Sequence, residues 1–554
     1  MPQLRQQDKA SKNGMVVTHH KEATDVGVDV LISGGNAIDA AIASCLAVGV
    51  VQPASSGIGG GGYLVYEMSG KGGVIGFPMR GSGSANTDSY KLVDEKGGVG
   101  GFQWHGVENN ENLEGYKSIA IPGAISGLFL SHQMFGTIPI KELMYPAIKL
   151  ARDGFYPEWY DLYAIGLYSG KFTRLNELAR IFLPDGEMPK SGILFKQSDL
   201  ADTLEHISLE GVDEFYKGDI AKSIINEIQK GGGFLNSKDM SIYRPFNWDK
   251  GLEIKYFDNV VRVPPFASGG ITTAMTLKFY EAIKKSGSFT EKLNAYISAA
   301  KMAYSDRFEH IGDPMLVDVP WDGMISDQYS FERAKDVSFK YEDSQSGNPW
   351  KYDKKQKDET SISGSYPSFD SGTTHLCVYD RFGNAVSLTN TLMGGFGSGI
   401  VPKGTGVIMN NGMMWFDPLP GRVNSVMPGK FPLNNMSPGL ILDKEGVKSA
   451  LGAAGGRKIT NCVSQLIIKM LESEISAQEA VDSPRVDCSN PKTLLDDRFE
   501  QSLVKTLSSI GHEFDFSDGV FTHNFSTPAV IKRMSNGDLT GGVHAFGRGF
   551  VKGI

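Results

Sequence analysis

The chain has 554 residues, of which 40% are hydrophobic and 21% are charged, proportions that are typical of a globular protein. Its formal net charge of −8 comes without a basic block, which argues against nucleic acid and an anionic membrane surface as partners. Glycine is unusually frequent, at 67 of 554 residues or about 12%, against about 7% in an average protein. Clustered glycines indicate tight turns or backbone that lies close to a ligand.

The N-terminal stretch MPQLRQQDKASKNGM is polar and lacks the apolar core of a secretory signal. The most apolar stretch, AIDAAIASCLAVGVVQP, is too short to span a bilayer and predicts a buried helix. The four cysteines, at positions 45, 377, 462 and 488, form no CxxC pair, and a chain of this length does not need disulfides. These features favour a cytoplasmic protein.

The predicted elements follow one another with no internal repeat. Residues 22–51 predict two helices broken at SGGN, where Asn36 would cap the second. Further along we expect strands at 63–68 and 72–77, helices within 122–152, 196–230 and 269–313, hairpins over 251–265 and 373–391, a polar linker over about 338–372, and an apolar helix at 459–474. Helices that bracket strand-rich segments indicate a layered sheet-and-helix architecture.

The motifs of several common sites are absent from the sequence. The glycine loops Gly57–Gly62 and Gly394–Ile400 lack the surroundings of a nucleotide-binding loop. The ten histidines form no HExxH and no recognisable ligand spacing, so we expect neither a metal nor a cofactor. No G-x-S-x-G serine elbow occurs. Cys377 is better explained as a packed thiol than as a nucleophile.

One hairpin carries a pattern that calls for a chemical explanation. In SGTTHLCVYDRFGNAVSLTNT, which begins at Ser371, two alternating segments flank a three-residue turn whose Gly383 would adopt the left-handed conformation. Counting outward from that turn places Thr373 opposite Thr391, with Cβ atoms about 5 Å apart. One face would present hydroxyls and other polar side chains, and the leucines and valines of the other face would pack in the core.

Two interpretations of this pair are open. Threonine favours strands for reasons of packing alone. Alternatively, Thr373 is a nucleophile, because a threonine hydroxyl can be activated by the residue's own α-amine, whose pKa lies near ~8, when that residue is an N-terminus. The stretch before it is polar and predicts an exposed linker. Self-cleavage between Gly372 and Thr373 would then create the N-terminus.

The order of motifs along nearly the whole chain resembles the γ-glutamyltransferase family of N-terminal nucleophile hydrolases. The matching segments include GGNAIDAAIA, GIGGGGYLVY, PGAISGL, PAIKLARDGF, PPFASGGI, AYSDRFEHIGDP, TTHLCVYDRFGNAVSLTNTL, PLNNMSP and GAAGGRKI. The resemblance implies an α+β protein with an αββα four-layer sandwich. It also implies that the precursor is cut into a large subunit, residues 1–372, and a small subunit, residues 373–554, which stay together as a heterodimer that can dimerise again.

The same resemblance assigns roles to four residues. It implies that Thr373 attacks the amide of a small-molecule substrate while Thr391 hydrogen-bonds its hydroxyl. The backbone N–H groups of Gly455 and Gly456 would form the oxyanion hole. The acyl group would then pass to water or to an amine acceptor.

The recognition residues depart from the family pattern. Pro78 stands where the family has the arginine that binds the substrate α-carboxylate, and Trp415 stands where it has the acidic residue that binds the α-ammonium. The resemblance therefore implies an altered acyl specificity. Candidate substrate-binding residues are Asn434, Asn435, Trp415 and the nearest arginine, Arg80. Two alternatives remain: glutathione hydrolysis through a carboxylate site built on Arg80, and a catalytically silent scaffold.

Overall fold

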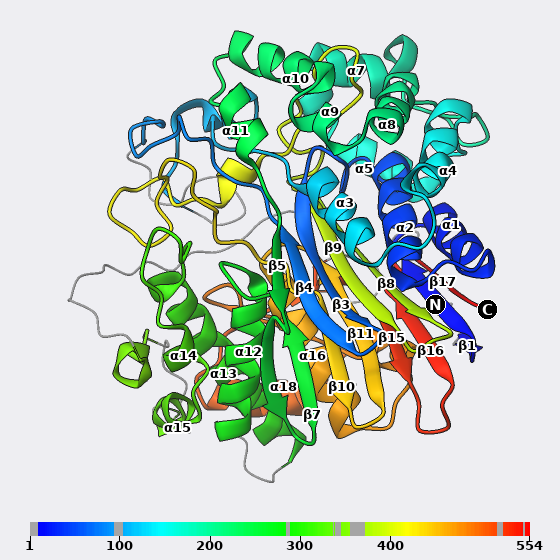
Figure 1. Ribbon diagram of the computed structural model, residues 1–554. Helices are drawn as coiled ribbons and strands as arrows, with labels where there is room; N and C mark the ends of the chain where they lie inside the picture. Colours follow the sequence, from blue (N-terminus) through cyan, green and yellow to red (C-terminus); the bar gives the residue numbers. More distant parts are fainter. Residues whose placement is uncertain are drawn as a thin grey trace.

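Two antiparallel sheets stacked face to face form the centre of the computed structural model (Figure 1). The structure describes residues 9–93, 104–283, 288–335, 337, 345–354, 372–517, 524–546 and 549–554. The first sheet runs in the order β17 (Phe550–Gly553), β2 (Gly14–Thr18), β8 (Gly372–Asp380), β9 (Ala385–Met393), β3 (Gly61–Met68), β4 (Lys71–Phe77) and β5 (Phe246–Asp249). The second runs in the order β1 (Lys9–Ser11), β16 (Leu539–Val543), β15 (Thr527–Arg533), β11 (Gly446–Ala454), β10 (Gly439–Asp443), β7 (Asn259–Val263) and β6 (Leu252–Tyr256).

Helices cover the outer face of each sheet, which gives the predicted αββα order of layers and confirms the α+β class. The layer beside the first sheet contains α1 (Lys21–Ile32), α2 (Ala37–Val51), α3 (Ala124–Phe135), α4 (Ile140–Asp153) and α8 (Ser198–Glu210). Around it lie the shorter helices α5 (Trp159–Leu167), α6 (Ser169–Phe172), α7 (Asn176–Phe182), α9 (Val212–Tyr216), α10 (Asp219–Lys230) and α11 (Ser237–Ile242).

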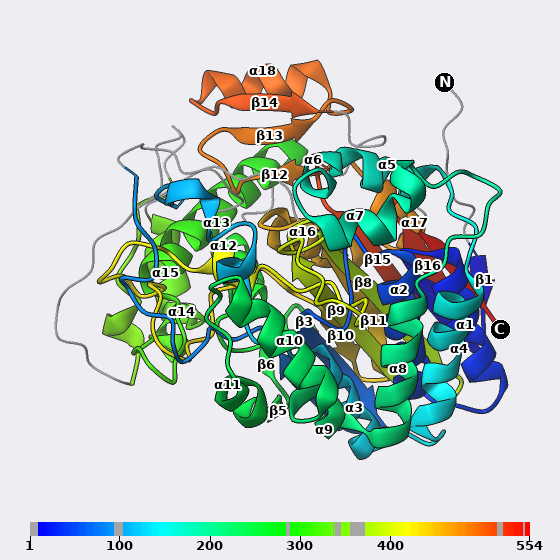
Figure 2. The same ribbon diagram turned by 90° about the horizontal axis from the view of Figure 1, so that it is seen from above.

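The layer beside the second sheet contains α12 (Gly269–Ile283), α13 (Phe289–His310), α16 (Lys458–Glu472) and α17 (Ala477–Asp482), with α14 (Trp321–Met324) and α15 (Asp327–Lys335) next to it. A three-stranded sheet of β12 (Val486–Asp487), β13 (Thr493–Asp496) and β14 (Phe514–Ser517) stands with α18 (Gln501–Ser509) at one end of the molecule (Figure 2). Short 3₁₀ turns occur at Glu108–Asn110, Tyr116–Ser118, Pro184–Gly186, Pro349–Tyr352 and Gly412–Trp415.

The predicted break between the first two helices is confirmed. Gly34 has a φ of 96°, a left-handed conformation that favours glycine after a helix end. The side chain of Asn36 accepts hydrogen bonds from the N–H groups of Ile38 and Asp39 and so caps α2. Alanines and valines on nearly every side of α2 are buried, which matches the predicted core helix. No helix in the described part of the chain is long and apolar enough to cross a membrane.

The strands β8 and β9 lie in the middle of the first sheet and are buried on both faces. The prediction that one face presents its hydroxyls outward is wrong, because the second sheet covers that face. The Ser387 hydroxyl donates to the Leu451 carbonyl at 2.8 Å, and the ring of His375 lies against Gly452. A Cβ at Gly452 would meet that ring at 2.3 Å, so a glycine in β11 lets the two sheets approach.

Part of the predicted linker is bound to the protein rather than exposed. The Gly347 N–H donates to Asp306 Oδ1 at 2.8 Å, and the Gly347 carbonyl lies 2.8 Å from His310 Nε2. Arg333 Nη2 donates to the Gln345 carbonyl at 2.7 Å. Residues 345–354 therefore dock beside α13–α15. The remaining parts of the linker, 338–344 and 355–371, lie outside the described residues.

Candidate active site

The two threonines predicted to face each other do so at the adjacent ends of β8 and β9. Thr373 and Thr391 are register partners, and their Oγ1 atoms lie 2.9 Å apart. The Thr391 hydroxyl also donates to the Gly372 carbonyl at 2.6 Å and accepts from the Met393 N–H at 2.9 Å. Because a hydroxyl carries one proton, the Thr373 hydroxyl must be the donor to Thr391. The cross-strand prediction is confirmed, and Thr391 contacts both the Thr373 hydroxyl and the carbonyl of the preceding peptide bond.

Gly372 occupies a space that admits no side chain. A Cβ at this position would lie 2.5 Å from the Ala54 carbonyl oxygen and 2.7 Å from the Gly394 carbonyl oxygen. Both contacts are with backbone atoms, which cannot rotate away as a side chain can. The absence of a side chain therefore lets the Gly372 carbonyl reach the Thr391 hydroxyl.

The paired glycines predicted as an oxyanion hole form the turn between β11 and α16. Gly455 has a φ of 137° and Gly456 a φ of 62°, both in the region that favours glycine. A Cβ at Gly455 would lie 2.5 Å from the Ser526 hydroxyl. Because α16 begins at Lys458, the backbone here lies at the positive end of a helix dipole, which favours negative charge. Both glycines line the same cleft as Thr373.

That cleft has a volume of about 450 Å³, within the usual range for ligand sites. One wall is formed by tyrosine and leucine side chains of α5 and the residue that follows it. The facing wall is formed by the start of α16 and by the three-stranded sheet. The charged side chains that line the cleft are Arg457, Lys458, Lys492 and Asp515. Among the described lining residues, cations therefore outnumber carboxylates, and the one carboxylate in this set belongs to Asp515, an exposed residue of β14.

Asn435 is the substrate-binding candidate that the structure brings to the cleft. Its Oδ1 accepts a hydrogen bond from Arg307 Nη2 at 2.8 Å. This contact fixes the orientation of the amide, because the oxygen faces the guanidinium. Asn435 can thus offer its amide N–H groups as donors to an oxygen of a ligand.

The other three candidates, Asn434, Arg80 and Trp415, are not among the residues that line the cleft, and their role in binding substrate stays a prediction. The Asn434 amide donates to the Ala267 carbonyl at 2.8 Å and to the Tyr63 hydroxyl at 3.2 Å. The amide of Asn434 therefore stabilises a buried loop.

Arg80 and Trp415 are likewise engaged elsewhere. Arg80 Nε donates to the Gly429 carbonyl at 2.5 Å, and its guanidinium stacks over the Phe431 ring at 5.2 Å. Trp415 is only 3% exposed and belongs to an apolar cluster with Met413 and Met436. Both side chains stabilise the loops around the first sheet.

Two buried arginines give the floor of the cleft its positive potential. Burial lowers the pKa of Arg307 to about 10 and that of Arg457 to about 9. Both pKa values leave the guanidinium groups charged at neutral pH. Arg457 stacks over the Phe308 ring at 4.8 Å, and Arg307 donates to backbone carbonyls, a hydroxyl and an amide oxygen, all of them uncharged. A carboxylate bound nearby would be stabilised by this charge.

Residues that sequence reasoning missed include the cationic pair Arg457–Lys458 and the α5 tyrosines. The pair directly follows Gly455 and Gly456 in GGRKI, so the sequence contained that signal. The aromatic residues of EWYDLYAIGLY carried no comparable signal, because nothing in the sequence places α5 beside Thr373. Among the described residues, no three His, Cys, Asp or Glu side chains come together as a metal site.

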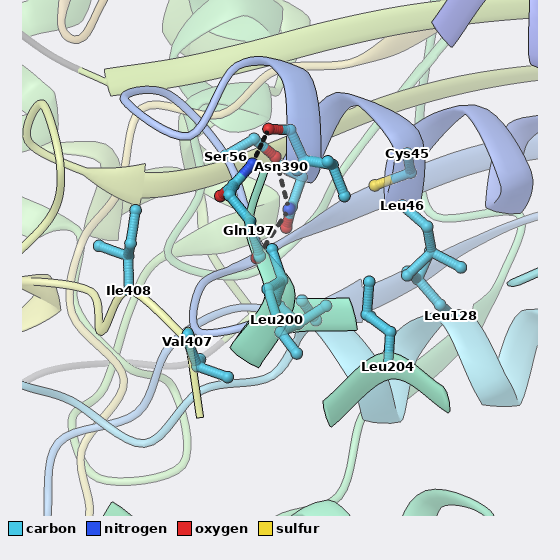
Figure 3. A pocket seen from close by; sticks show the side chains of 16 residues that line it. Cys45, Leu46, Ser56, Leu128, Gln197, Leu200, Leu204, Asn390, Val407 and Ile408 are labelled. Carbon is cyan, nitrogen blue, oxygen red and sulfur yellow. Dashed lines mark hydrogen bonds between the residues drawn. The ribbon is translucent and has the colours of Figure 1, made fainter. Parts of the chain in front are cut away.

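A small enclosed cavity lies on the other side of β9 (Figure 3). Asn390 reaches it from the face opposite Thr391, and its Nδ2 donates to the Ser56 hydroxyl at 2.9 Å. The cavity is about 20 Å³, room for one water molecule, and its lining includes aliphatic side chains of α2 and α8. Asn390 thereby ties β9 to the loop before Gly57, whose Ala54 and Ser55 line the catalytic cleft.

Two histidines lie next to the threonine pair in the layer between the sheets. The His375 N–H donates to His19 Nδ1 at 3.3 Å, so His19 accepts with that nitrogen and is neutral. Burial lowers the pKa of His19 to about 4 and that of His375 well below its usual range. Both imidazoles therefore lack charge at neutral pH, and the Thr373 hydroxyl has no imidazolium behind it.

A family model described as gamma-glutamyltranspeptidase matches residues 23–550. The chain belongs to the gamma-glutamyltranspeptidase family. It is 33% identical over 514 residues to a glutathione hydrolase proenzyme of Bacillus subtilis (strain 168), covering 91% of this chain and 86% of that protein. It is 32% identical over 510 residues to the acylase ACY 1 proenzyme of Pseudomonas sp. (strain V22), covering 90% and 87% of the two chains.

A solved structure extends the likeness to the whole fold. The cephalosporin acylase from Bacillus halodurans superposes with a TM-score of 0.88 at 25% identity, over 99% of this chain and 97% of that one. This gamma-glutamyltranspeptidase family member is therefore an autoprocessed amide hydrolase or acyltransferase with the fold of the N-terminal nucleophile hydrolases. The hypothesis of a catalytically silent scaffold finds no support among these relatives.

The buried histidine predicts a pH dependence of stability. The unfolded state binds a proton at His19 near pH 6.5, whereas the folded state binds it only near pH 4. The free energy of unfolding should therefore fall as the pH drops from 6.5 to 4, by about 3 kcal/mol for this residue, and level off below. His19→Asn keeps an acceptor near the Nδ1 position and should lose less stability over this range. Denaturant titrations at pH 7, 5.5 and 4 measure the difference.

The control for this prediction is His206→Asn, because His206 is exposed on α8. That variant should follow the pH dependence of the unchanged protein. Equal losses of stability in His19→Asn and the unchanged protein would show that the His19 proton does not govern the acid range.

Proposed function

We propose that Thr373 is the nucleophile and that the precursor cuts itself between Gly372 and Thr373. The Thr373 hydroxyl attacks the Gly372 carbonyl carbon and the amide C–N bond breaks. The proton lost from the hydroxyl passes to the leaving nitrogen, which becomes the α-amine of Thr373. Water then hydrolyses the ester that links the two fragments. The 2.9 Å contact between the two threonine oxygens and the 2.6 Å contact from Thr391 to the Gly372 carbonyl support this chemistry.

Turnover repeats the attack on an external amide. The α-amine of Thr373 accepts the hydroxyl proton as the oxygen attacks the substrate carbonyl, and the leaving amine takes a proton as the C–N bond breaks. The N–H groups of Gly455 and Gly456 would stabilise the oxyanion of the tetrahedral intermediate. Water or an amine then accepts the acyl group from the Thr373 ester.

A cytoplasmic location is also part of the proposal, because the four cysteines are free and buried.

We infer that the preferred acyl group carries a terminal carboxylate and lacks an α-amine. One observation carries this inference: among the described residues, the charged lining of the cleft is Arg457, Lys458, Lys492 and an exposed Asp515, so none of the described lining residues is a buried acid. An α-ammonium placed there would lose hydration without gaining a counter-ion, which is unfavourable by several kcal/mol. A carboxylate would be attracted by the cations and could accept from Asn435. Hydrolysis of γ-glutamyl compounds is the alternative, favoured by the relatives named glutathione hydrolase.

The first prediction of this mechanism concerns processing. The purified protein should separate on a denaturing gel into fragments of roughly two thirds and one third of the mass, and N-terminal sequencing should place Thr373 first in the smaller one. Thr373→Ala should stay intact and inactive, because the same hydroxyl drives cleavage and turnover. Thr374→Ala serves as the control, since that side chain points to the other face of β8. A cut Thr373→Ala chain would contradict the proposal.

Gly372→Ala should separate processing from turnover. The added methyl would press on the Ala54 and Gly394 carbonyls and displace the bond to be cut, so the half-time of cleavage should lengthen at least tenfold. The small subunit that finally forms starts at Thr373 and is unchanged. Its kcat/KM, normalised to the cut fraction, should match that of the unchanged protein within twofold. Normal cleavage kinetics in Gly372→Ala would show that the narrow space does not position the bond.

The acyl group is tested with two anilides that differ only in the α-amine. We expect kcat/KM for glutaryl anilide to exceed that for γ-glutamyl anilide by tenfold or more, which corresponds to ~1.4 kcal/mol of transition-state preference. Arg80→Gln, outside the cleft, should leave the ratio unchanged. If γ-glutamyl anilide is preferred by tenfold, the charge argument fails and glutathione hydrolysis becomes the better assignment.

A further inference from the structure

The turn between β11 and α16 contains two residues with unusual backbone freedom. Gly455 and Gly456 lack side chains, so neither can hold the turn in place by side-chain packing. On the strand side, β11 ends at Ala454, which pairs with Thr527 of β15. On the helix side, Arg457 occupies the N-cap position of α16, and its long side chain is not of the type that caps a helix. The helix side of the turn therefore needs support from another element.

Tyr304 of α13 provides this support from within the core. Its hydroxyl donates to the Arg457 carbonyl at 2.5 Å, since a carbonyl can only accept. The phenol oxygen also lies 2.6 Å from Thr460 Oγ1 and 3.1 Å from Asn461 Nδ2, which then both donate to it. Burial raises the pKa of Tyr304, so the hydroxyl keeps its proton at neutral pH. The carbonyl directly after Gly456 thus faces a donor that two further hydrogen bonds hold in place.

The same part of α13 contacts the floor of the cleft at two other points. Phe308 lies one turn after Tyr304, and its ring supports the Arg457 guanidinium at 4.8 Å. Arg307, on the same turn, orients the Asn435 amide through its contact at 2.8 Å. The helix α13 thus connects the turn rigidly to the amide of Asn435.

A second tyrosine of α13 distinguishes this role from ordinary packing of the core. The Tyr296 hydroxyl also binds α16, because it donates to the Asn461 carbonyl at 3.0 Å and lies 2.9 Å from Ser464 Oγ. Tyr296 is 4% exposed and Tyr304 is 6% exposed, so the two side chains are buried alike. Of the two, Tyr304 is the one that contacts Arg457, next to the glycines. Loss of the Tyr296 hydroxyl should therefore weaken the contact between the same two helices without affecting the turn.

We propose that Tyr304 is a positioning residue for the oxyanion hole. By holding the Arg457 carbonyl, its hydroxyl keeps the N–H groups of Gly455 and Gly456 directed at the substrate oxygen that becomes negatively charged in the transition state. The proposal rests on the proposed function, in which these N–H groups stabilise the oxyanion that forms when Thr373 attacks the substrate.

Self-cleavage should not depend on Tyr304. The carbonyl that is attacked in that reaction belongs to Gly372, and it accepts a hydrogen bond from the Thr391 hydroxyl at 2.6 Å. We therefore expect the Tyr304 hydroxyl to matter for turnover and not for cleavage. A side chain with a general structural role would affect both reactions or neither.

Tyr304→Phe tests the proposal, because it keeps the ring and removes only the hydroxyl. With the faster of the two anilides as substrate, we expect kcat and kcat/KM to fall together by at least fivefold, as is typical of an interaction made only in the transition state. The half-time of self-cleavage should change less than twofold. In the matched control, Tyr296→Phe, the denaturant midpoint should fall as in Tyr304→Phe, but kcat should stay within twofold of the unchanged protein.

Thr460 offers a second variant. Its hydroxyl lies 3.4 Å from the Arg457 carbonyl and could replace the donor that Tyr304→Phe removes. Thr460→Val alone should lower kcat less than twofold, because Tyr304 still holds the carbonyl. Added to Tyr304→Phe, the same change should lower kcat at least threefold further.

A transition-state analogue gives a measurement that does not need turnover. In a boronic acid whose B(OH)₂ group replaces the reacting carbonyl group of the preferred acyl group, boron bonds to the Thr373 oxygen while the hydroxyl proton passes to the α-amine. The tetrahedral anion resembles the transition state and places an oxygen in the oxyanion hole. Its inhibition constant should rise at least fivefold in Tyr304→Phe and less than twofold in Tyr296→Phe. The corresponding free carboxylic acid should change less than twofold in both.

The results distinguish this proposal from the proposed function. An unchanged protein that neither cuts itself nor hydrolyses either anilide would contradict the proposed function, and the positioning role with it. If the unchanged protein is active, normal kcat in both Tyr304→Phe and the double variant would overturn the positioning role alone. A Tyr304→Phe chain that stays uncut, or that loses cleavage and turnover by the same factor, would also overturn it, because either result indicates a general structural role.

Discussion

The hydrogen bond between Thr373 and Thr391 is the interaction on which the site depends, and a turn at the far end of the hairpin sets it. Asp380 fixes that turn: its Oδ1 accepts from the N–H groups of Phe382 and Asn384 at 2.8 and 3.1 Å. Its Oδ2 also accepts from the Ala37 N–H at the start of α2, at 3.0 Å. A slip of one residue in this register would turn every side chain of one strand to the opposite face. The position of Thr373, the proposed nucleophile, is therefore set by a carboxylate at the other end of the strand.

The sequence was sufficient for the parts of the site that follow local rules. Strand alternation and the left-handed Gly383 gave the pairing of Thr373 with Thr391, and Asn36 gave the start of α2. The sequence was insufficient where a prediction depended on which other part of the chain packs against a segment. The polar face of the hairpin was expected to face outward because the sequence does not say that a second sheet covers it.

The substrate-binding residues show the same limit. Arg80 was proposed because it lies close in sequence to the position where the family has its arginine, but its guanidinium packs on Phe431. The charge near the cleft comes instead from Arg307 and Arg457, which are far from Arg80 in sequence. Two residues that are close in sequence can be expected to share a loop. Which groups their side chains contact depends on the tertiary structure.

In the proposed function, catalysis and specificity are carried by different layers of this protein. The threonine pair and the glycine turn belong to the two central sheets, where packing on both sides allows little change. The walls of the cleft come from α5 and the three-stranded sheet, which lie outside the sandwich (Figure 2). Such an arrangement lets the walls change while the catalytic geometry is kept. It explains how relatives of nearly equal identity to this chain can be named as a hydrolase of glutathione and as an acylase.

Thr391 has one hydroxyl proton, so it can donate to only one acceptor at a time. In the uncut chain that proton is donated to the Gly372 carbonyl, which it polarises toward attack by Thr373. In the proposed reaction, cleavage makes Gly372 a chain end and gives Thr373 an α-amine, so Thr391 can then donate its proton to the oxygen of Thr373 or to the new amine. Thr391 can thus assist first the cleavage and then the turnover that we propose, because cleavage frees its hydroxyl proton from the Gly372 carbonyl.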